Sequence, residues 1–189
     1  MLNEKKILLI IGGGIAAFKC HDLIRGLREA GASVTPVLTE AGKEFVTPLS
    51  ISVLSGSKVY ADLFDLEDET QMGHIELSRN SDLIVIVPAT ADLLAKMASG
   101  LANDLASTLL LATDTEVLAA PAMNIRMWEH LATRRNIQLL KKDGIGFIGP
   151  VEGSMACGEF GFGRMAEPEQ IIVAIKKKLS LGKLKGKHI

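Results

Sequence analysis

Short apolar runs of strand length recur along the chain, and segments of helix length separate them. The runs lie at residues 6–11, 33–38, 82–87, 116–120 and 144–148. Solid apolar runs are typical of strands that are buried on both faces, and their alternation with helices predicts a parallel sheet between two helical layers. We therefore expect a single α/β domain with three layers, in which helices cover both faces of the sheet.

Apolar residues at helical spacing predict the helices between these runs. The first helix, 15–30, ends before Gly31, a typical residue after a helix C-cap. Thr47 and Pro48 predict a capped helix that extends to Leu54. Further helices are expected at 91–99, 104–111, 125–142 and 169–179. The stretches 56–80 and 149–168 do not fit the alternation, and we expect irregular loops there that carry function.

Charge and composition exclude several classes of protein. The chain has 189 residues, of which 48% are hydrophobic, and 21 basic residues nearly balance 22 acidic ones. Because no basic face with interleaved aromatic residues is apparent, nucleic acid is not an expected partner. No apolar window reaches the roughly 18 residues of a membrane span. Six lysines and no acidic residue follow Glu169, so the formal charge of −1 is the balance of −7 up to that residue and +6 after it.

The two cysteines and the first residues indicate the compartment. Cys20 and Cys157 lie in unlike contexts without a CxxC spacing, which gives no reason to expect a disulfide or a metal site. The chain starts with charged residues and a short strand-like run instead of the pattern of a signal peptide. We expect a protein of the reduced cytoplasm.

A glycine-rich turn follows the first predicted strand. Gly12, Gly14 and Ala17 form a GxGxxA pattern, which brings backbone N–H groups and a helix N-terminus towards an anion. The pattern is weak by itself, because such a sequence can also be no more than a turn. The second strand ends at Thr39, whereas an NAD-binding Rossmann domain has a carboxylate there. A mononucleotide therefore fits this turn at least as well as a dinucleotide.

Polar residues also follow two later strands. Thr90 and Asp92 come after the run 82–87, and Asn124 comes after 116–120. Open α/β sheets bind ligands at the carboxyl ends of their strands, so these residues and the glycine turn are expected to line one site. Thr90 and Asn124 are also ordinary helix N-cap residues. For Thr90, ligand binding and helix capping both stay open. For Asn124, a cap alone does not explain why Pro121 and Met123 stand beside it.

Six segments taken together carry a resemblance to a known family. They are 13–19 (GGIAAFK), 73–77 (GHIEL), 88–92 (PATAD), 102–105 (ANDL), 121–124 (PAMN) with Met127 and Trp128, and 153–165 (GSMACGEFGFGRM). In this order they resemble the homo-oligomeric flavin-containing cysteine decarboxylases, and within them the phosphopantothenoylcysteine decarboxylases that bacteria fuse to a ligase. The resemblance covers about residues 4–180. It implies a Rossmann-like, flavodoxin-like decarboxylase domain at 1–180, with 181–189 as a linker or the start of a ligase domain.

The resemblance implies an FMN enzyme of coenzyme A biosynthesis. Such an enzyme converts 4′-phosphopantothenoylcysteine to 4′-phosphopantetheine and CO₂. A carboxylate on a carbon without an electron sink does not leave, so flavin first oxidises the thiol end to a thioaldehyde, and the ene-thiol left after CO₂ loss is then reduced. Members of the family form trimers in which neighbouring subunits share the flavin site, and four trimers can form a dodecamer.

The resemblance assigns three catalytic residues. His74 corresponds to the active-site histidine, and an imidazole with an ordinary pKa of about 6.5 is a credible base; without the resemblance, a histidine that caps or packs against a short helix at 75–79 is the simpler interpretation. Asn124 corresponds to the residue that holds the substrate carboxylate, and a neutral amide does so without stabilising the anion too strongly. Cys157 corresponds to the proton donor of the final reduction, whereas Cys20 is expected to pack in the core.

The same resemblance proposes two sets of binding residues and no metal. The residues expected to bind FMN are Gly14, Ile15, Ala16, Thr39, Thr90, Asp92, Ala120 and Met123. The residues expected to bind substrate are Asn124, Ala156, Gly158, Arg164 and Met165, most of them in a flap with hinge glycines that closes over the site. Arg164, Arg126 and Lys96 are candidates for the substrate phosphate, although simple solvation also explains Lys96.

Two other classes of function remain as alternatives. One is a flavin prenyltransferase or a peptide cysteine decarboxylase of the same fold, and the other is a non-catalytic flavin-binding regulatory subunit. Cys157 and the flap sequence argue against the first. The regulatory relatives tend to carry long acidic extensions, and this sequence has none.

Overall fold

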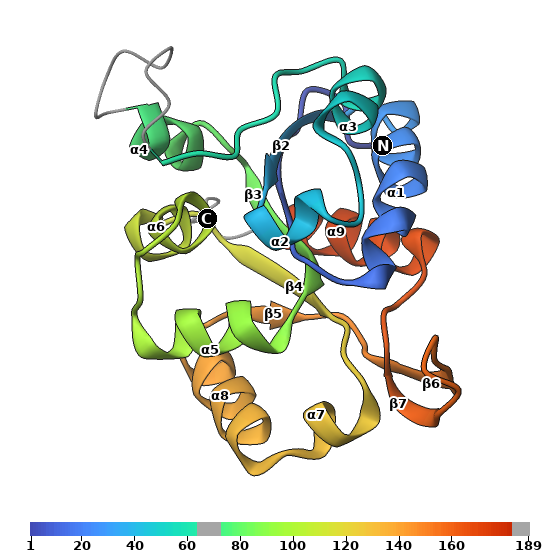
Figure 1. Ribbon diagram of the computed structural model, residues 1–189. Helices are drawn as coiled ribbons and strands as arrows, with labels where there is room; N and C mark the ends of the chain where they lie inside the picture. The colour runs from blue at the N-terminus through green and yellow to red at the C-terminus, as the bar shows by residue number, and fades with distance from the viewer. Residues whose placement is uncertain (64–72, 183–189) are drawn as a thin grey trace.

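A five-stranded parallel sheet forms the centre of the protein. The computed structural model describes residues 1–63 and 73–182, without the side chains of 73–75, 181 and 182. The strands are β1 (Lys6–Ile11), β2 (Ser33–Leu38), β3 (Leu83–Ala89), β4 (Val117–Pro121) and β5 (Gly146–Phe147). They pair in the order β2-β1-β3-β4-β5, and every pair is parallel (Figure 1). All five strands therefore point their carboxyl ends to the same edge.

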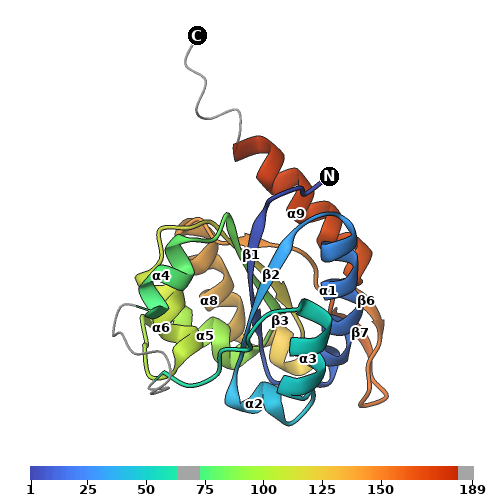
Figure 2. The same ribbon diagram turned by 90° about the horizontal axis from the view of Figure 1, so that it is seen from above.

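Helices cover both faces of this sheet. On one face lie α1 (Cys20–Glu29), α3 (Pro48–Ser55) and α9 (Pro168–Gly182), and on the other lie α4 (Gly73–Arg79), α5 (Ala91–Ser99), α6 (Leu105–Ala112) and α8 (Leu131–Lys142). Figure 2 shows the three layers from above. Three short helices begin after strands: η1 (Ile15–Lys19), α2 (Glu40–Lys43) and α7 (Ile125–Glu129). The predicted three-layer α/β fold is confirmed.

The apolar runs divide their side chains between two cores. Along β1, Ile7, Leu9 and Ile11 belong to the cluster under α1 and α9, whereas Leu8 and Ile10 belong to the cluster under α5, α6 and α8. Successive side chains of a strand point to opposite faces, so a strand covered on both sides must be apolar at every position. Accordingly, every residue of β3 is buried.

Most predicted elements are present, but two predicted helices are each divided: 15–30 into the 3-10 helix η1 and α1, and 125–142 into α7 and α8. β1 and β2 have the expected bounds, and Gly31 follows α1 with φ +93°. The expected helix 125–142 is divided at His130, whose backbone is extended and whose Nδ1 accepts a hydrogen bond from the Ala132 N–H at 3.1 Å. A new helix therefore starts after His130, because that side chain caps it.

The prediction of an irregular loop at 149–168 is wrong for most of its length. This stretch contains an antiparallel hairpin of β6 (Val151–Ser154) and β7 (Phe160–Arg164). Gly153, Gly161 and Gly163 lie inside these strands, so they are not hinges between rigid parts. Within the other stretch, 73–79 forms α4, and the segment 64–72 lies outside the described residues. None of the helices in the described ranges is long and apolar enough for a membrane span.

Candidate active site

The segments that follow β1, β3 and β4 meet at the carboxyl edge of the sheet. A Cβ on Gly12 would lie 2.3 Å from the Pro88 carbonyl oxygen, so the glycine turn touches the end of β3. The Ala122 N–H donates to the Ala89 carbonyl at 3.2 Å, and the Met123 N–H donates to the Gly163 carbonyl of β7 at 3.0 Å. The glycine turn, two strand ends and the hairpin thus form one continuous structure, as the sequence predicted for the first three.

The glycine turn is closely packed on two sides and open at Gly14. A Cβ on Gly13 would lie 2.3 Å from the Ala41 Cβ of α2. Together with the Gly12 contact, this approach explains why the turn needs glycine. At Gly14 the nearest atom to such a Cβ is the Pro88 Cγ at 4.0 Å. The turn is therefore held from behind by β3 and α2 and leaves space in front of η1.

The start of η1 differs from the starts of the three other helices at this edge. In the described chain no side chain caps η1. By contrast, Thr39, Thr90 and Asn124 cap α2, α5 and α7 by accepting hydrogen bonds from backbone N–H groups. The first N–H groups of a helix need acceptors, and an anionic ligand can supply them. Here η1 is the helix start that is open to such a ligand.

Thr39 and Thr90 are both helix caps; the sequence left that interpretation open for Thr90, whereas the cap at Thr39 was not predicted. The Thr39 hydroxyl donates to the Ile11 carbonyl at 3.0 Å and accepts from the Gly42 N–H at 3.0 Å. The Thr90 hydroxyl accepts from the Leu93 N–H at 3.2 Å. Thr39 therefore uses its proton within the chain, whereas the proton of Thr90 has no acceptor among the described residues and can serve a ligand.

Asp92 and Lys96 belong to a charged cluster with Asp104. The Lys96 ammonium lies 2.7 Å from an Asp104 carboxylate oxygen and 3.2 Å from Asp92, and the hydrogen bond to Asp104 raises the pKa of Lys96. Asp104 in turn accepts from the Ser107 N–H and begins α6. Lys96 is a candidate for the substrate phosphate in the sequence, but its two carboxylate partners argue against that role. The two ion pairs also show that Lys96 is not simply a solvated surface lysine.

Asn124 combines a structural contact with a free donor group. Its Oδ1 accepts a hydrogen bond from the Met127 N–H at 2.8 Å, which caps α7. The side-chain NH₂ group has no acceptor within the described residues, and the residue is exposed. Because the cap fixes the amide plane, the NH₂ group is held towards solvent, where it can bind a carboxylate.

The hairpin holds Cys157 at its exposed end. Ala156, Cys157 and Gly158 are all exposed. The Cys157 thiol donates to a Glu159 carboxylate oxygen at 3.5 Å, and the same carboxylate lies 3.8 Å from the exposed Arg126. Because the thiol is exposed, a ligand can reach it, and a ligand would have to replace Glu159 as the acceptor of its proton. Sequence reasoning missed Glu159, although it stands only two residues from the predicted cysteine.

Glycines in β7 hold the hairpin against α7. A Cβ on Gly161 would lie 2.3 Å from the Ile125 Cδ1, and one on Gly163 would lie 2.3 Å from the Met123 carbonyl oxygen. These approaches, with φ values of +156° and +146°, leave little freedom for other residues. They bring the Cys157 hairpin next to the segment that carries Asn124. The structure therefore brings together the segments that carry two of the three predicted catalytic residues.

Several other predicted site residues have different surroundings. Met165 is predicted to bind substrate, and in this structure its side chain is 1% exposed and belongs to the buried cluster that also contains residues of α1 and α9. Arg164 donates to Glu167 at 2.7 Å. The side chain of Ala120 is buried, whereas Ile15 is 60% exposed. As expected, Cys20 is buried; its thiol donates to the Val87 carbonyl at 3.0 Å, and burial raises its pKa.

The third predicted catalytic residue, His74, is placed only through its backbone. It lies in the first turn of α4, and its side chain is outside the described residues. In both ribbon views α4 lies beside α6 and away from the hairpin (Figures 1 and 2). Within one chain, therefore, the helix of His74 is not adjacent to Asn124 and Cys157.

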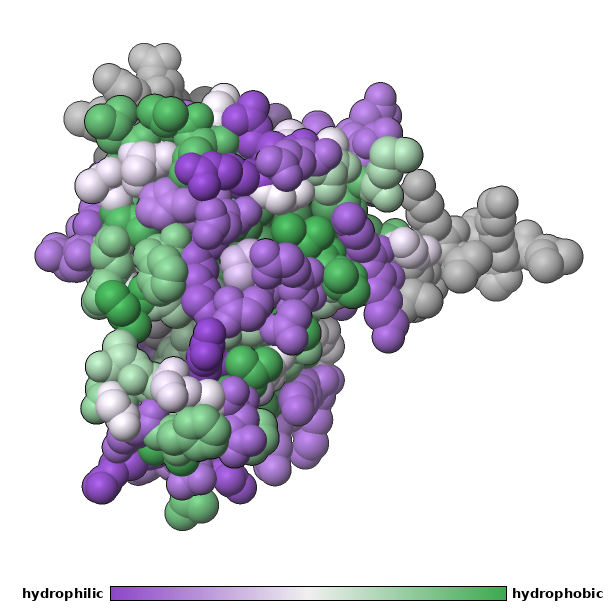
Figure 3. Space-filling model, turned by 90° about the vertical axis from the view of Figure 1, so that its right-hand side faces the viewer, coloured by the Kyte–Doolittle hydropathy of each residue, from purple (hydrophilic) through white to green (hydrophobic). Residues whose placement is uncertain are grey.

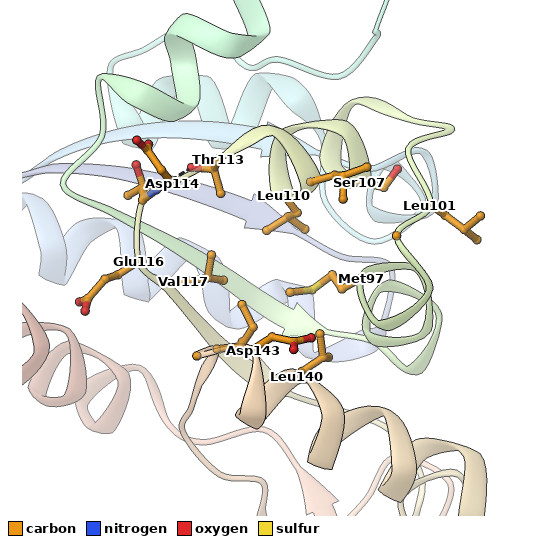
Figure 4. Close-up of a pocket in the computed structure, with 15 residues that line it drawn as sticks. Met97, Leu101, Ser107, Leu110, Thr113, Asp114, Glu116, Val117, Leu140 and Asp143 are labelled. Atoms are coloured by element: carbon orange, nitrogen blue, oxygen red, sulfur yellow. Dashed lines mark hydrogen bonds between the residues drawn. The ribbon is translucent and has the colours of Figure 1, made fainter.

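One surface hollow of the described residues lies away from the predicted site. A hollow of about 420 Å³ lies between α5, α6 and α8, where Met97, Leu110, Val117 and Leu140 line it (Figure 4). Val117 begins β4, so this hollow is at the amino edge of the sheet and includes none of the predicted site residues. Within the described part of the chain, no group of three or more metal-ligating side chains occurs.

Known proteins resemble this chain over nearly its whole length. A family model described as Flavoprotein matches residues 1–180. The chain is 50% identical over 188 residues to the coenzyme A biosynthesis bifunctional protein CoaBC of Vibrio vulnificus (strain YJ016), covering 100% of this chain and 47% of the relative. It is 49% identical over 171 residues to the CoaBC protein of Escherichia coli (strain K12), covering 90% and 42%. The chain thus spans about half the length of these curated relatives.

Two solved structures are similar to the chain over nearly its full length. A cysteine-to-serine mutant of a PPC decarboxylase, in complex with pantothenoylaminoethenethiol, is 32% identical with a TM-score of 0.86, covering 94% of this chain and 100% of that one. The FMN binding protein AtHal3 is 32% identical with a TM-score of 0.82, covering 98% and 100%.

The contact between the hairpin and the Asn124 segment gives a testable prediction. Gly163→Ala places a methyl group against the Met123 carbonyl, a backbone atom that no side-chain rotation can move. Strain and a weakened hydrogen bond should together cost about 2 kcal/mol of local stability. We expect limited proteolysis within 151–164 to be at least tenfold faster, with a smaller change in the unfolding midpoint of the domain. Ser154→Ala, an exposed change on β6, is the control, and equal cleavage of the two variants would contradict the role of this contact.

Proposed function

This chain belongs to the Flavoprotein family, and from that premise we propose that it is an FMN-dependent decarboxylase of coenzyme A biosynthesis. Its substrate is 4′-phosphopantothenoylcysteine, and its products are 4′-phosphopantetheine and CO₂. The coverage and identity of the CoaBC relatives support this proposal. The observation that favours it most is that β7 packs on the α7 segment, so that the hairpin with the exposed Cys157 lies against the segment that carries Asn124.

The open start of η1 fits FMN. An anionic or electron-rich part of the cofactor needs N–H donors, and the uncapped first turn at Ile15 and Ala16 offers them beside the open space at Gly14. Thr90 adds a hydroxyl proton, and Asp92 and the backbone at Ala120 and Met123 complete the proposed set. Thr39 supports the set by holding α2 behind the turn. When bound, FMN supplies the oxidation of the thiol end and the later return of hydride.

The residues of the chain bind the substrate and move its protons. The NH₂ group of Asn124 holds the substrate carboxylate in a fixed orientation, because Oδ1 is occupied by the helix cap. A neutral donor suits this step, since a cation would stabilise the negative charge that must leave as CO₂. Cys157 donates a proton to the carbon skeleton when the ene-thiol is reduced, and Ala156 and Gly158 leave its thiol accessible. His74 is proposed as the base that receives the thiol proton.

The separation of α4 from the hairpin favours a site that neighbouring copies complete. We propose that the chain forms a trimer, with a dodecamer of four trimers as the larger assembly, so that α4 of one copy approaches the hairpin of another. Large apolar side chains are exposed on η1 and α3: Ile15, Phe18, Leu49 and Val53 are 54–74% exposed. On the side of the molecule that Figure 3 shows, hydrophilic residues lie between separate groups of hydrophobic ones. Such groups are candidates for subunit contacts.

The wider context follows from the relatives. Because the chain covers 47% of the Vibrio vulnificus relative, we propose that its complete protein carries a phosphopantothenate–cysteine ligase joined through residues 181–189. The cytoplasm is the proposed compartment.

A product assay tests the proposed function directly. The purified chain should release FMN on denaturation and should form CO₂ and 4′-phosphopantetheine from 4′-phosphopantothenoylcysteine. A flavin prenyltransferase, a peptide cysteine decarboxylase or a regulatory subunit would leave this substrate unchanged. Release of FAD or NAD, or an FMN-loaded chain without this product, would disprove the proposal.

Replacement of Cys157 tests its role as proton donor. Cys157→Ser should still release CO₂, but formation of the reduced product should fall by about 10²-fold or more, because a positioned proton donor contributes that much. The oxidised ene-thiol should then accumulate and be detectable by mass spectrometry. Ser154→Ala on the same hairpin should retain normal product formation. A fully active Cys157→Ser variant would remove this residue from the mechanism.

The assembly is tested by light scattering in solution. The mass should be three or twelve times the 20.2 kDa of one chain. Leu49→Glu together with Val53→Glu should lower it to that of a monomer, because each change places a charge in the proposed contact. Val173→Glu on α9, where Val173 is 64% exposed, is the matched control and should leave the mass unchanged. A wild-type monomer would contradict the trimer.

A further inference from the structure

Three charged side chains meet where the chain leaves the hairpin and enters α9. The Lys19 ammonium donates to both oxygens of the Glu167 carboxylate, at 2.9 and 2.8 Å. The Arg164 guanidinium donates to one of the same oxygens at 2.7 Å. The hydrogen bond from Lys19 is the main reason that the pKa of Glu167 lies below its ordinary value. Glu167 therefore acts as a charged bridge between two cations.

The bridge is partly shielded from water. The Lys19 side chain is only 13% exposed, while those of Glu167 and Arg164 are 38% and 44% exposed. In the described chain no other acidic group lies within ion-pair distance of Lys19. A largely buried ammonium without a counter-charge is costly, so the loss of the Glu167 charge would displace Lys19 or admit water.

The two cations belong to different parts of the site. Lys19 is the last residue of η1, which starts at the glycine turn. Arg164 is the last residue of β7, and its side chain lies across β6: a Cβ on Gly153 would be 3.0 Å from the Arg164 Cδ and 3.2 Å from its Nη1. Through Arg164, then, Glu167 contacts both strands of the hairpin, and through Lys19 it contacts the helix at the proposed cofactor site.

The hairpin is consequently held on two sides by contacts of different kinds. Towards α7 it is held by backbone packing, in which the Gly163 carbonyl oxygen accepts a hydrogen bond from the Met123 N–H. Towards η1 it is held by the Glu167 bridge, and Met165 and Ala166 fix the chain between them in the core. The bridge is the charged contact between the end of the hairpin and η1.

We infer that Glu167 is a positioning residue for the decarboxylation proposed above, because it fixes the distance between η1 and the hairpin that carries Cys157. It touches neither the substrate nor the proton that is transferred. Its effect is to keep the thiol within reach of the carbon that receives this proton, and a shift of about 1 Å in such a group can lower a rate strongly. This inference rests on the proposed function for its catalytic part and on the structure for its mechanical part.

The test compares Glu167→Gln with Glu169→Gln. The first change keeps the size of the side chain and an acceptor oxygen but removes the charge, while Glu169 is exposed and two residues away. In the chain without FMN, hydrogen exchange of the amides in 151–164 should become at least fivefold faster in Glu167→Gln only. With FMN and substrate, kcat for the reduced product should fall about tenfold, with KM and FMN affinity unchanged within about twofold. The oxidised ene-thiol should accumulate, as expected for Cys157→Ser.

The outcomes separate a positioning role from a merely structural one. Equal exchange in the two variants would overturn the inference, and so would faster exchange with an unchanged ratio of oxidised to reduced product. Weaker FMN binding, a higher KM and a lower thermal stability, all in parallel, would also overturn it, because they would show a general structural role. If Glu167→Gln does not fold, Lys19→Met removes the same contact from the other side and should raise exchange equally. If the wild-type chain makes no 4′-phosphopantetheine, the proposed function fails, while the exchange experiment still decides whether Glu167 holds the hairpin.

Discussion

The close approach of the glycine turn to the end of β3 is the contact on which the rest of the site depends. At Gly12 and Gly13 a single methyl group would lie 2.3 Å from Pro88 or Ala41. Because the turn is this close, η1 begins directly above the sheet edge where β3 and β4 also end. A bulkier turn would displace η1, and with it the uncapped N–H groups that we assign to FMN.

Polar residues at this edge serve the fold and the site at the same time. Thr90 and Asn124 each give an oxygen to a helix cap and keep a donor for a ligand. A cap therefore does not compete with binding, since it fixes the orientation of the donor that remains. Glycines in the hairpin likewise serve both fold and site, because Gly161 and Gly163 let β7, and with it the hairpin of Cys157, lie directly on the segment that carries Asn124.

Much of this arrangement could be predicted from residue patterns, and the failures have physical causes. The apolar runs predicted β1 and β2 with their observed bounds, because burial on both faces leaves a clear signal. The hairpin at 151–164 was missed because glycines interrupt the strand pattern, as at Gly161 between Phe160 and Phe162, and these glycines are required by contacts with Met123 and Ile125 that the sequence does not show. The break at His130 was missed because the apolar periodicity continues through it, while a side-chain cap starts a new helix.

The order of residues along the chain was sufficient to predict the alternating α/β fold and the glycine turn. It was also sufficient to identify the family from motifs that include Asn124 and Cys157. Each of these signals is local, since it depends on neighbouring residues or on a short period along the chain. The packing of distant segments was needed to show that Met165 is part of the core, that Lys96 is occupied by two carboxylates, and that Glu167 joins Lys19 to Arg164. Lys19 and Glu167 are 148 residues apart, and no pattern along the chain predicts which charges meet when helices and a hairpin pack around a sheet.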